Sequence, residues 1–365
     1  MVELYQTGVG NTYLDFLNSY LEPRVGYVTV EGALSDLFEI DNSVFQGTVL
    51  GPPLWNTFFA DVAVSATAQG DNEAMFADDL NVFREFDRLC PLQRVEQHLQ
   101  QTRESVHKWG KRNRVIFDAG KEHIVVIHPD HGYGEPFKLL GCLIDVKLTM
   151  SCAVDAILSV ARPKVTSLLR LRGHYSLSDL IIQYKTHIWS YIEYQNGCIY
   201  HAAPTHLDRF DRLQDHFLTE LQSNASYAFV EHNFAPTTLR RDIGMLGLIH
   251  KRVIGLAHPA YETLMPLQPP EYYSTGRGTA HIRHNKQIYT HVDKCISQHV
   301  MFHRSIFGLC FVYNSLPQYI VDFDTVSSFQ SELTKIAKCR CRNNISTWKL
   351  SFNATYHAHN AFVTV

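Results

Sequence analysis

Two neighbouring carboxylates, Asp78 and Asp79, are the residues of this sequence whose type and spacing are best suited to chemistry. They stand between two short apolar runs at 74–76 and 80–83, a pattern that predicts a β-hairpin with the acids at its tip. Two carboxylates at one turn repel each other, and a divalent cation such as Mg²⁺ or Mn²⁺, shared with substrate phosphates, relieves that repulsion. The same pattern also fits a solvated turn without chemistry, since Asp is frequent in turns.

The segments around this turn are expected to supply the elements that position it. A Gln46-Gly47 dipeptide lies in a loop ahead of a helix, and its glycine permits close approach of the backbone to a ligand. The elements expected in order are a helix at 14–21, a strand pair at 26–40, a loop and helix at 42–64, an amphipathic helix at 91–110 and a strand at 124–127.

Length and composition describe a globular chain. Its 365 residues, 45% hydrophobic and 19% charged, suffice for two or three domains. The formal net charge of −3 gives no overall signature of nucleic-acid binding, so such binding must come from local patches. The eight cysteines include no Cys-x-x-Cys pair, which fits a reducing compartment. No apolar run has the length of a membrane span, so we expect an intracellular protein without membrane contact, in the nucleus or the cytoplasm.

Beyond residue 150 the apolar spacing is that of helices. The helix at 154–172 contains Pro163, which predicts a kink or two shorter helices, and its basic residues fit either a phosphate contact or a solvated face. An aromatic-rich helix at 178–200 fits core packing or a base-stacking surface. Further helices are expected at 204–222, at 234–256 and from 324 onward, and a linker or long loop at 266–283.

The series of motifs, in its order and spacing, resembles the reverse transcriptases of non-LTR retrotransposons. In that family a Pro-Gln-Gly block ending in Leu-Gly-Pro precedes a hairpin with Phe or Tyr followed by Ala-Asp-Asp, and residues 45–52 and 76–79 match these two motifs. Upstream, residues 16–24 resemble the family's Trp-Leu-x-Ser-Tyr-Leu-x-x-Arg helix. Downstream, Lys121 resembles the Lys of an Asn-x-x-Lys-Ser/Thr-Glu motif, and residues 137–145 resemble a Tyr-Leu-Gly-x-x-x-Asp element.

This resemblance implies an α+β fold. Residues 1–148 would form part of a right-hand polymerase palm, an antiparallel sheet with flanking helices. Residues 149–265 would form an all-helical, thumb-like region, and residues 266–365 a linker and the C-terminal tail region of the element.

The resemblance also implies RNA-directed DNA polymerisation by two-metal nucleotidyl transfer, with RNA template, DNA primer and dNTPs as partners. It sets no oligomeric state. The implied site residues are Asp78 and Asp79 for catalysis and for Mg²⁺ (or Mn²⁺), Lys121 near the leaving phosphates, Gln46, Gly47 and Phe76 for nucleotide and template, and Leu140 and Gly141 for the primer.

Two departures from the family pattern qualify this expectation. Phe45 stands where the family has Pro. The family's first catalytic Asp and its fingers would precede Met1, so the sequence reads as N-terminally truncated, and the 365-residue chain is expected to be inactive by itself. The alternative is a catalytically dead remnant of an element that at most binds nucleic acid.

Overall fold

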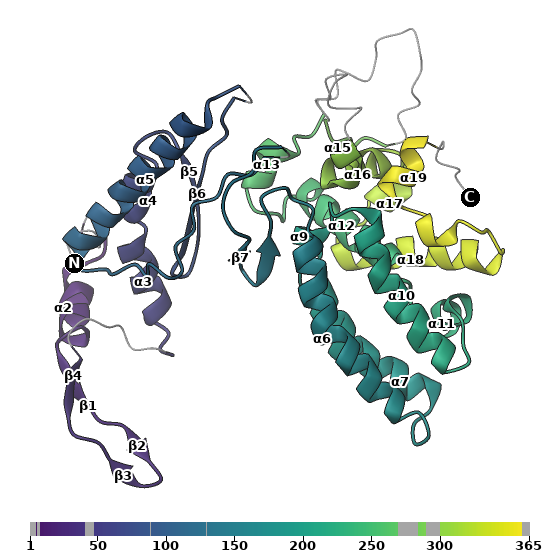
Figure 1. The fold of residues 1–365 in the computed structure, drawn as a ribbon, viewed down its shortest axis with the longest axis horizontal. Helices are drawn as coiled ribbons and strands as arrows, with labels where there is room; N and C mark the ends of the chain where they lie inside the picture. The colour runs from purple at the N-terminus through teal and green to yellow at the C-terminus, as the bar shows by residue number, and fades with distance from the viewer. Residues whose placement is uncertain are drawn as a thin grey trace. The chain divides into compact units, whose positions relative to one another are not determined.

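The chain divides into two compact units, Met1–Ile124 and Val125–Val365, which are described separately here (Figure 1). The computed structural model describes residues 5, 8–40, 47–87, 89–128, 130–268, 284–289 and 300–359. The division falls inside the segment predicted as palm, and the domain limits at 148 and 265 stay predictions.

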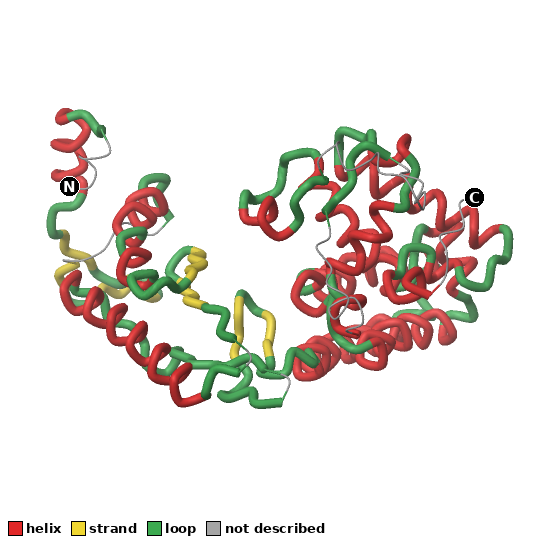
Figure 2. The backbone as a smooth tube through the Cα atoms, turned by 90° about the horizontal axis from the view of Figure 1, so that it is seen from above, coloured by secondary structure: helices red, strands yellow, loops and turns green. Residues whose placement is uncertain are grey.

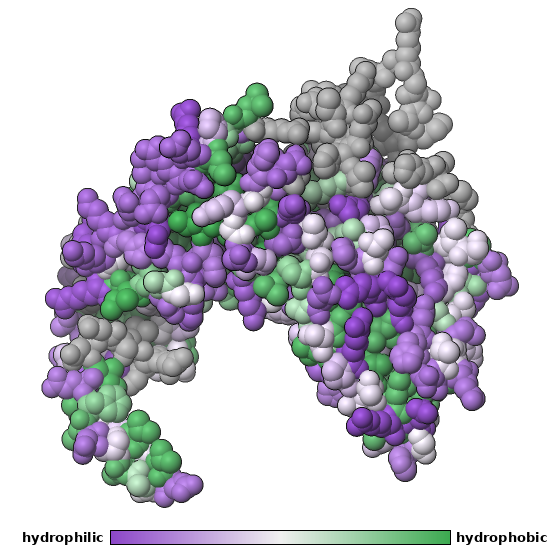
Figure 3. Space-filling model, in the orientation of Figure 1, coloured by the Kyte–Doolittle hydropathy of each residue, from purple (hydrophilic) through white to green (hydrophobic). Residues whose placement is uncertain are grey.

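The first unit opens with helix α2 (Asn11–Tyr20) and a narrow β-hairpin. Strand β1 (Arg24–Gly26) pairs antiparallel with β4 (Phe38–Ile40), and β2 (Thr29–Val30) pairs with β3 (Ala33–Leu34). The helix predicted at 14–21 and the strand pair predicted at 26–40 are therefore confirmed. Several large apolar side chains of the hairpin are exposed, as the green patches at the lower left of Figure 3 show.

A small aromatic core joins the other elements of the first unit. Helix α3 (Gly51–Phe59), helix α4 (Val62–Ala66) and helix α5 (Leu92–Asn113) surround it. The amphipathic helix at 91–110 is thus confirmed, and the helical part of the segment at 42–64 is present as two helices, while residues 42–46 lie outside the described residues. Phe59 and Trp109 are almost fully buried at its centre. The spacing of apolar residues on α5 places Trp109 against α3 and α4, as an amphipathic helix requires.

The strand predicted at 124–127 is wrong. Only Val126 pairs, in a single antiparallel bridge with Tyr133, and this run lies where one unit ends and the other begins. An apolar run forms a strand only where a neighbouring strand accepts its backbone hydrogen bonds. Among the described residues this run has one such bridge, so it connects the two units as irregular chain.

The second unit begins with a hairpin of β7 (Phe137–Leu139) and β8 (Cys142–Ile144), followed by helix α6 (Ser151–Arg170). Helix α6 is one helix that contains Pro163, so the predicted alternative of two shorter helices is wrong, and the predicted kink stays a prediction. Pro163 is exposed while its neighbours Ala161 and Val165 are buried. Packing of that buried face offsets the backbone hydrogen bond that proline removes.

The helix predicted at 178–200 is present as one helical run at 177–193 that contains a π-helical turn, followed after a two-residue turn by a last short helix. A π-helical turn accommodates one extra residue, and here it allows both Tyr184 and Trp189 to point into the core. Both rings contact Phe234, with centroids 5.1 and 4.7 Å away. Core packing is thus confirmed for Tyr184, Trp189 and Tyr200, which are buried, whereas Tyr194 is 73% exposed. The pieces are α7 (Leu177–Tyr184), the π-helical turn η1 (Lys185–Trp189), α8 (Ser190–Glu193) and α9 (Asn196–Ile199).

The rest of the second unit is almost entirely helical (Figure 2). One buried cluster lies among α6, α7 and α10, and a second joins α12 to α16 and α18, so residues 300–359 pack against the preceding helices. The helices are α10 (Pro204–Glu220), α11 (Ala225–His232), α12 (Thr237–Val253), α13 (Ala260–Leu264), α15 (Val300–Arg304), α16 (Ile306–Asn314), α17 (Gln318–Val321), α18 (Val326–Arg342), the short η3 (Trp348–Leu350) and α19 (Ala354–His359).

The fold is therefore a mixed α+β arrangement that is mostly helical, with small antiparallel hairpins, as predicted at the level of class. The helices predicted at 204–222, 234–256 and from 324 are present as α10, α12 and α18. The linker predicted at 266–283 lies mostly outside the described residues. None of the described helices combines the length and the apolar character needed to cross a bilayer.

Candidate active site

Asp78 and Asp79 lie at the tip of an antiparallel hairpin, as predicted. Strand β5 (Asn72–Phe76) pairs with β6 (Asp79–Phe83) so that Phe76 stands opposite Asp79. The turn therefore consists of Ala77 and Asp78 alone, and Ala77 has a positive φ of 54°. Asp78 belongs to the turn, whereas Asp79 is the first residue of a strand.

The pairing of the two strands decides which side chains share a face of the hairpin. Residues directly opposite each other in an antiparallel pair point to the same side, so Asp79 shares its face with Phe76. Leu80 points to the other side and packs against the aromatic core of the unit. The face of Asp79 is thus turned away from this core, and Phe76 on it is 64% exposed. Both carboxylates are exposed and accessible to a cation.

Helix α3 supports the turn through one aromatic side chain. The indole Nε1–H of Trp55 donates to the carbonyl of Ala77 over 3.1 Å. At the start of the same helix, the amide of Gly51 donates to Oγ1 of Thr48 over 3.2 Å, and that hydroxyl lies 2.9 Å from the Tyr20 hydroxyl of α2. The Gly-Pro helix entry and the Asp-Asp turn, separate motifs in the sequence, are therefore joined physically.

Replacing Trp55 by phenylalanine tests this support. The ring would still stack on Phe59, 5.1 Å away, but the hydrogen bond to Ala77 would be lost. We expect a local cost of about 1 kcal/mol. Amide hydrogen exchange over residues 72–83 should therefore become several-fold faster, while exchange in α5 should not change. Equal exchange in both proteins would show that Trp55 does not stabilise the turn.

A second support, which the motifs of the sequence did not predict, lies at the start of β5. Asp71 is 7% exposed, and its carboxylate accepts from the Thr102 hydroxyl over 2.7 Å and contacts His98 Nε2 at 2.6 Å. Both partners belong to α5, so this acid fixes β5 to that helix. Two sequence features could have indicated this contact. One is an acid between a glycine turn and a predicted strand, and the other is a pair of polar residues spaced one helical turn apart on the next predicted helix.

Lys121 lies in the loop that follows α5. Its side chain is 85% exposed, and its ammonium group is 3.9 Å from Asp118. The neighbouring Glu122 fixes this loop to α5 by accepting from Arg103 at 2.8 Å and contacting His107 at 2.9 Å. Burial would raise the pKa of Glu122, but these two partners lower it overall. Within the described residues, no hydrogen bond or ion pair joins the Lys121 side chain to the hairpin.

The remaining predicted residues are divided between the two units. Gln46 lies outside the described residues, and Gly47 has a φ of 84° in the turn that leads to α3. Leu140 and Gly141 form the β7–β8 turn of the second unit, both with positive φ. Their carbonyls accept from the Tyr194 hydroxyl at 3.5 Å and the Gln195 amide at 3.3 Å.

Asp145, the acid that ends the Leu-Gly element, has a structural role. Its carboxylate accepts from the backbone amides of Lys147, Thr149 and Met150, at 3.1, 3.0 and 2.7 Å. Burial would raise the pKa of Asp145, but these hydrogen bonds stabilise its anion and lower the pKa below its usual range. The residue therefore closes the turn that leads from β8 into α6.

The donor set at the hairpin fits a hard divalent cation. Carboxylate oxygens are the ligands that Mg²⁺ and Mn²⁺ prefer, and Mg²⁺ usually retains water and substrate phosphates as further ligands. Across the described residues, no group of three or more His, Cys, Asp or Glu side chains is arranged to hold a metal. Asp78 and Asp79 thus supply two protein ligands at most from the described part of the chain.

Comparison with known proteins gives three relatives. The chain is 26% identical over 232 residues to the RNA-directed DNA polymerase from mobile element jockey of Drosophila funebris, an alignment covering 58% of this chain and 25% of the relative. It is 27% identical over 219 residues to the Drosophila melanogaster jockey polymerase, covering 54% and 24%. It is 28% identical over 256 residues to the probable RNA-directed DNA polymerase from transposon X-element of Drosophila melanogaster, covering 63% and 26%.

No family model and no solved structure matches the chain. The chain spans about a quarter of the length of the curated relatives it matches. The similarity to non-LTR retrotransposon RNA-directed DNA polymerases, first inferred from the order of the motifs, is confirmed by these three relatives.

Proposed function

We propose that this chain is a reverse transcriptase domain fragment of a non-LTR retrotransposon. The observation that carries the proposal is the exposed Asp78-Asp79 pair at the tip of a hairpin fixed to the Gly-Pro helix, in a chain similar to such polymerases. The first unit would contribute to the palm, and the helices after residue 148 would form a thumb-like region. RNA template, DNA primer and dNTPs are the partners that this function requires.

The roles of the individual residues follow from their positions. Asp78 and Asp79 would hold Mg²⁺ (or Mn²⁺), which when bound polarises the phosphoryl oxygens and stabilises the charge that develops in an in-line displacement. Phe76, exposed on the face of Asp79, offers a flat apolar surface beside the carboxylates. Lys121 is proposed to neutralise leaving phosphates. Gln46 and Gly47 are proposed to contact nucleotide and template, and Leu140 and Gly141 the primer.

The test is template-directed incorporation of dNTPs on an RNA template with a DNA primer. We expect the 365-residue chain alone to incorporate none, since the described residues bring only two carboxylates to the tip of the hairpin. A chimera in which this chain replaces the matching quarter of the jockey polymerase should incorporate dNTPs in Mg²⁺ or Mn²⁺. The unmodified jockey polymerase is the positive control.

Two outcomes would overturn the proposal. One is a chimera that folds, as circular dichroism and binding of the template–primer show, yet incorporates nothing. The other is incorporation that needs no divalent cation. If the chain alone proved active, the proposed function would stand and the expectation about its inactivity would be wrong.

A further inference from the structure

Two cysteine side chains of the second unit meet next to the β7–β8 turn. Cys142 is the first residue of β8, and Cys198 lies in α9. A hydrogen bond joins their two thiols, and both side chains pack in or against the same buried cluster. Both cysteines are free thiols in the structure. Two thiols in direct contact are the arrangement from which a disulfide bond can form.

Two further hydrogen bonds fix this arrangement. The Tyr194 hydroxyl donates to the carbonyl of Leu140 over 3.5 Å, and the side-chain amide of Gln195 donates to the carbonyl of Gly141 over 3.3 Å. Gly141 directly precedes Cys142 in the chain, and Gln195 is the N-cap residue of α9. The tertiary fold therefore brings the two thiols together, because the segments that carry them are joined at the neighbouring residues.

The two thiols differ in exposure and in acidity. Cys142 is 4% exposed, whereas Cys198 is half-buried at the edge of the cluster. The hydrogen bond between them raises the pKa of Cys142, as burial also does, and it lowers the pKa of Cys198 because it stabilises the Cys198 anion. Cys198 is therefore the thiol that ionises first and that an oxidant in solution reaches first.

We propose that Cys142 and Cys198 form a reversible disulfide when the protein meets a peroxide, and that this bond fixes the β7–β8 turn to α9. The Cys198 thiolate attacks one oxygen of hydrogen peroxide, which breaks the O–O bond, leaves a sulfenic acid on Cys198 and releases hydroxide. The Cys142 sulfur then attacks the sulfenic sulfur, the S–O bond breaks, and the Cys142 proton leaves with the hydroxyl group as water. The peroxide thus takes up the two electrons that the thiols lose.

A third cysteine close by, Cys152 of α6, is not expected to take part. It lies near enough to Cys142 to influence its ionisation. The Cys152 thiol contacts the carboxylate of Asp145 at 4.0 Å, and burial together with this negative charge raises the pKa of Cys152. A raised pKa leaves less thiolate, so Cys152 should neither react early with peroxide nor compete for Cys142.

The test is oxidation of the full chain by hydrogen peroxide, after which the remaining thiols are blocked with N-ethylmaleimide and the peptides are identified by mass spectrometry. A peptide pair linked through Cys142 and Cys198 should appear, and dithiothreitol should remove it. The link should form roughly 10-fold faster in the folded chain than in urea, because folding holds the two thiols in contact. Amide hydrogen exchange at residues 137–144 should become several-fold slower in the oxidised chain, because the new bond restricts the opening of this hairpin.

Two serine variants form a matched pair. Cys198→Ser should abolish the link and leave Cys142 reduced. Cys152→Ser removes a thiol from the same neighbourhood and should leave the rate of linking unchanged. Cys339, which is exposed on α18, is the internal reference for an accessible thiol, and its oxidation shows that the amount of peroxide was sufficient.

Three outcomes would overturn the proposal. The first is oxidation of Cys339 while Cys142 and Cys198 stay unlinked. The second is a link that forms equally fast in the folded and the urea-unfolded chain, since the fold would then contribute nothing. The third is a link from Cys142 to Cys152 in place of the proposed one. The inference goes beyond the proposed function and does not depend on it, because none of these assays involves polymerisation.

Discussion

Replacing Asp78 by asparagine in the active chimera is expected to lower dNTP incorporation by roughly 10³-fold, because an amide neither repeats the charge nor binds a hard cation comparably. The side chain keeps its size, and asparagine is as well suited to a turn as aspartate. Asp78 is exposed, so its replacement should change the free energy of unfolding by no more than about 0.5 kcal/mol. The loss should therefore appear in catalysis and not in folding.

The matched control for this variant lies on the same hairpin. Glu73 is exposed on β5 but stands opposite Val82, and it points to the face of the hairpin that carries Leu80. Glu73→Gln removes one carboxylate a few residues away and should leave incorporation within about 2-fold of the unaltered chimera. Equal losses in Asp78→Asn and Glu73→Gln would contradict a specific role for Asp78 and point to a general effect of charge.

A readout besides activity is available in the 365-residue chain itself. Paramagnetic Mn²⁺ should selectively broaden the amide resonances of residues 76–79, and Asp78→Asn should remove most of that broadening. With two exposed carboxylates as its protein ligands, the cation should bind only in the millimolar range, because few protein charges and a solvated site give weak affinity. Broadening spread evenly over all exposed acids would contradict a cation site at the hairpin.

The parts of the fold that could be predicted from the sequence are those set by local pattern. The Asp-Asp hairpin has two short apolar runs on either side of a tight turn, the amphipathic helix α5 has a clear period of about 3.6 residues, and tertiary contacts reinforce both. The run at 124–127 has an equally clear apolar pattern, but a strand needs a partner that its own sequence does not specify. Within 178–200, Tyr184 and Trp189 contact Phe234, which lies well downstream in the sequence, so no local pattern specifies these contacts.

The arrangement of the candidate site was even less predictable from the sequence, because it depends on contacts between distant residues. The order of the motifs identified Asp78 and Gly141, but order in a sequence carries no distance, and the structure assigns these two residues to different units. The supports of the hairpin were harder to foresee. The acceptor for Trp55 is a backbone carbonyl, and the partners of Asp71 lie far downstream on α5, so neither contact has a pattern that periodicity reveals.

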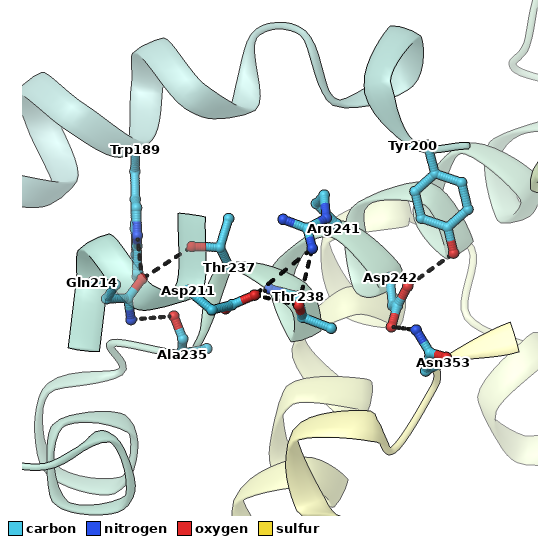
Figure 4. A network of polar contacts seen from close by, with 10 residues as sticks. All are labelled: Trp189, Tyr200, Asp211, Gln214, Ala235, Thr237, Thr238, Arg241, Asp242 and Asn353. Atoms are coloured by element: carbon cyan, nitrogen blue, oxygen red, sulfur yellow. Dashed lines mark hydrogen bonds and ion pairs between the residues drawn. The ribbon is translucent and has the colours of Figure 1, made fainter. Parts of the chain in front are cut away.

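A buried acid in the second unit makes stability depend on pH. Asp242 of α12 is 3% exposed, accepts from the Tyr200 hydroxyl at 2.8 Å, and contacts the Asn353 amide at 3.4 Å (Figure 4). Burial raises the pKa of Asp242 to about 7, although Tyr200, Arg241 and Asn353 all favour its anion. These residues join α12 to the segment before α19, so the protonation state of one carboxyl affects the packing of residues 300–359 on the earlier helices.

The raised pKa of Asp242 determines how the free energy of unfolding changes with pH. The folded state binds the Asp242 proton more tightly than the unfolded state, whose pKa is near 3.8. The resulting stabilisation is complete below pH 3.8 and is lost as pH rises to about 7. The rise in pKa corresponds to a change of roughly 4 kcal/mol across this range. An asparagine side chain carries no charge at any pH, so Asp242→Asn should remove this dependence.

The measurement is urea unfolding of both proteins at several pH values between about 4 and 8, a range that spans the titration of this carboxyl. Burial lowers the pKa of His201, His250, His284 and His357, and these groups titrate in both proteins, so their contributions cancel in the difference. The free energy of unfolding of Asp242→Asn relative to the unaltered chain should therefore rise steadily up to a pH of about 7 and then level off.

A second variant tests the cause of the shift. Tyr200→Phe removes a donor that favours the anion, so it should raise the pKa of Asp242. The loss of stability with rising pH that this carboxyl causes should then end at a higher pH than in the unaltered chain. Parallel stability curves for the unaltered chain and Asp242→Asn would mean that Asp242 is ionised in the folded state at acidic pH, and that the second unit admits water to this carboxyl.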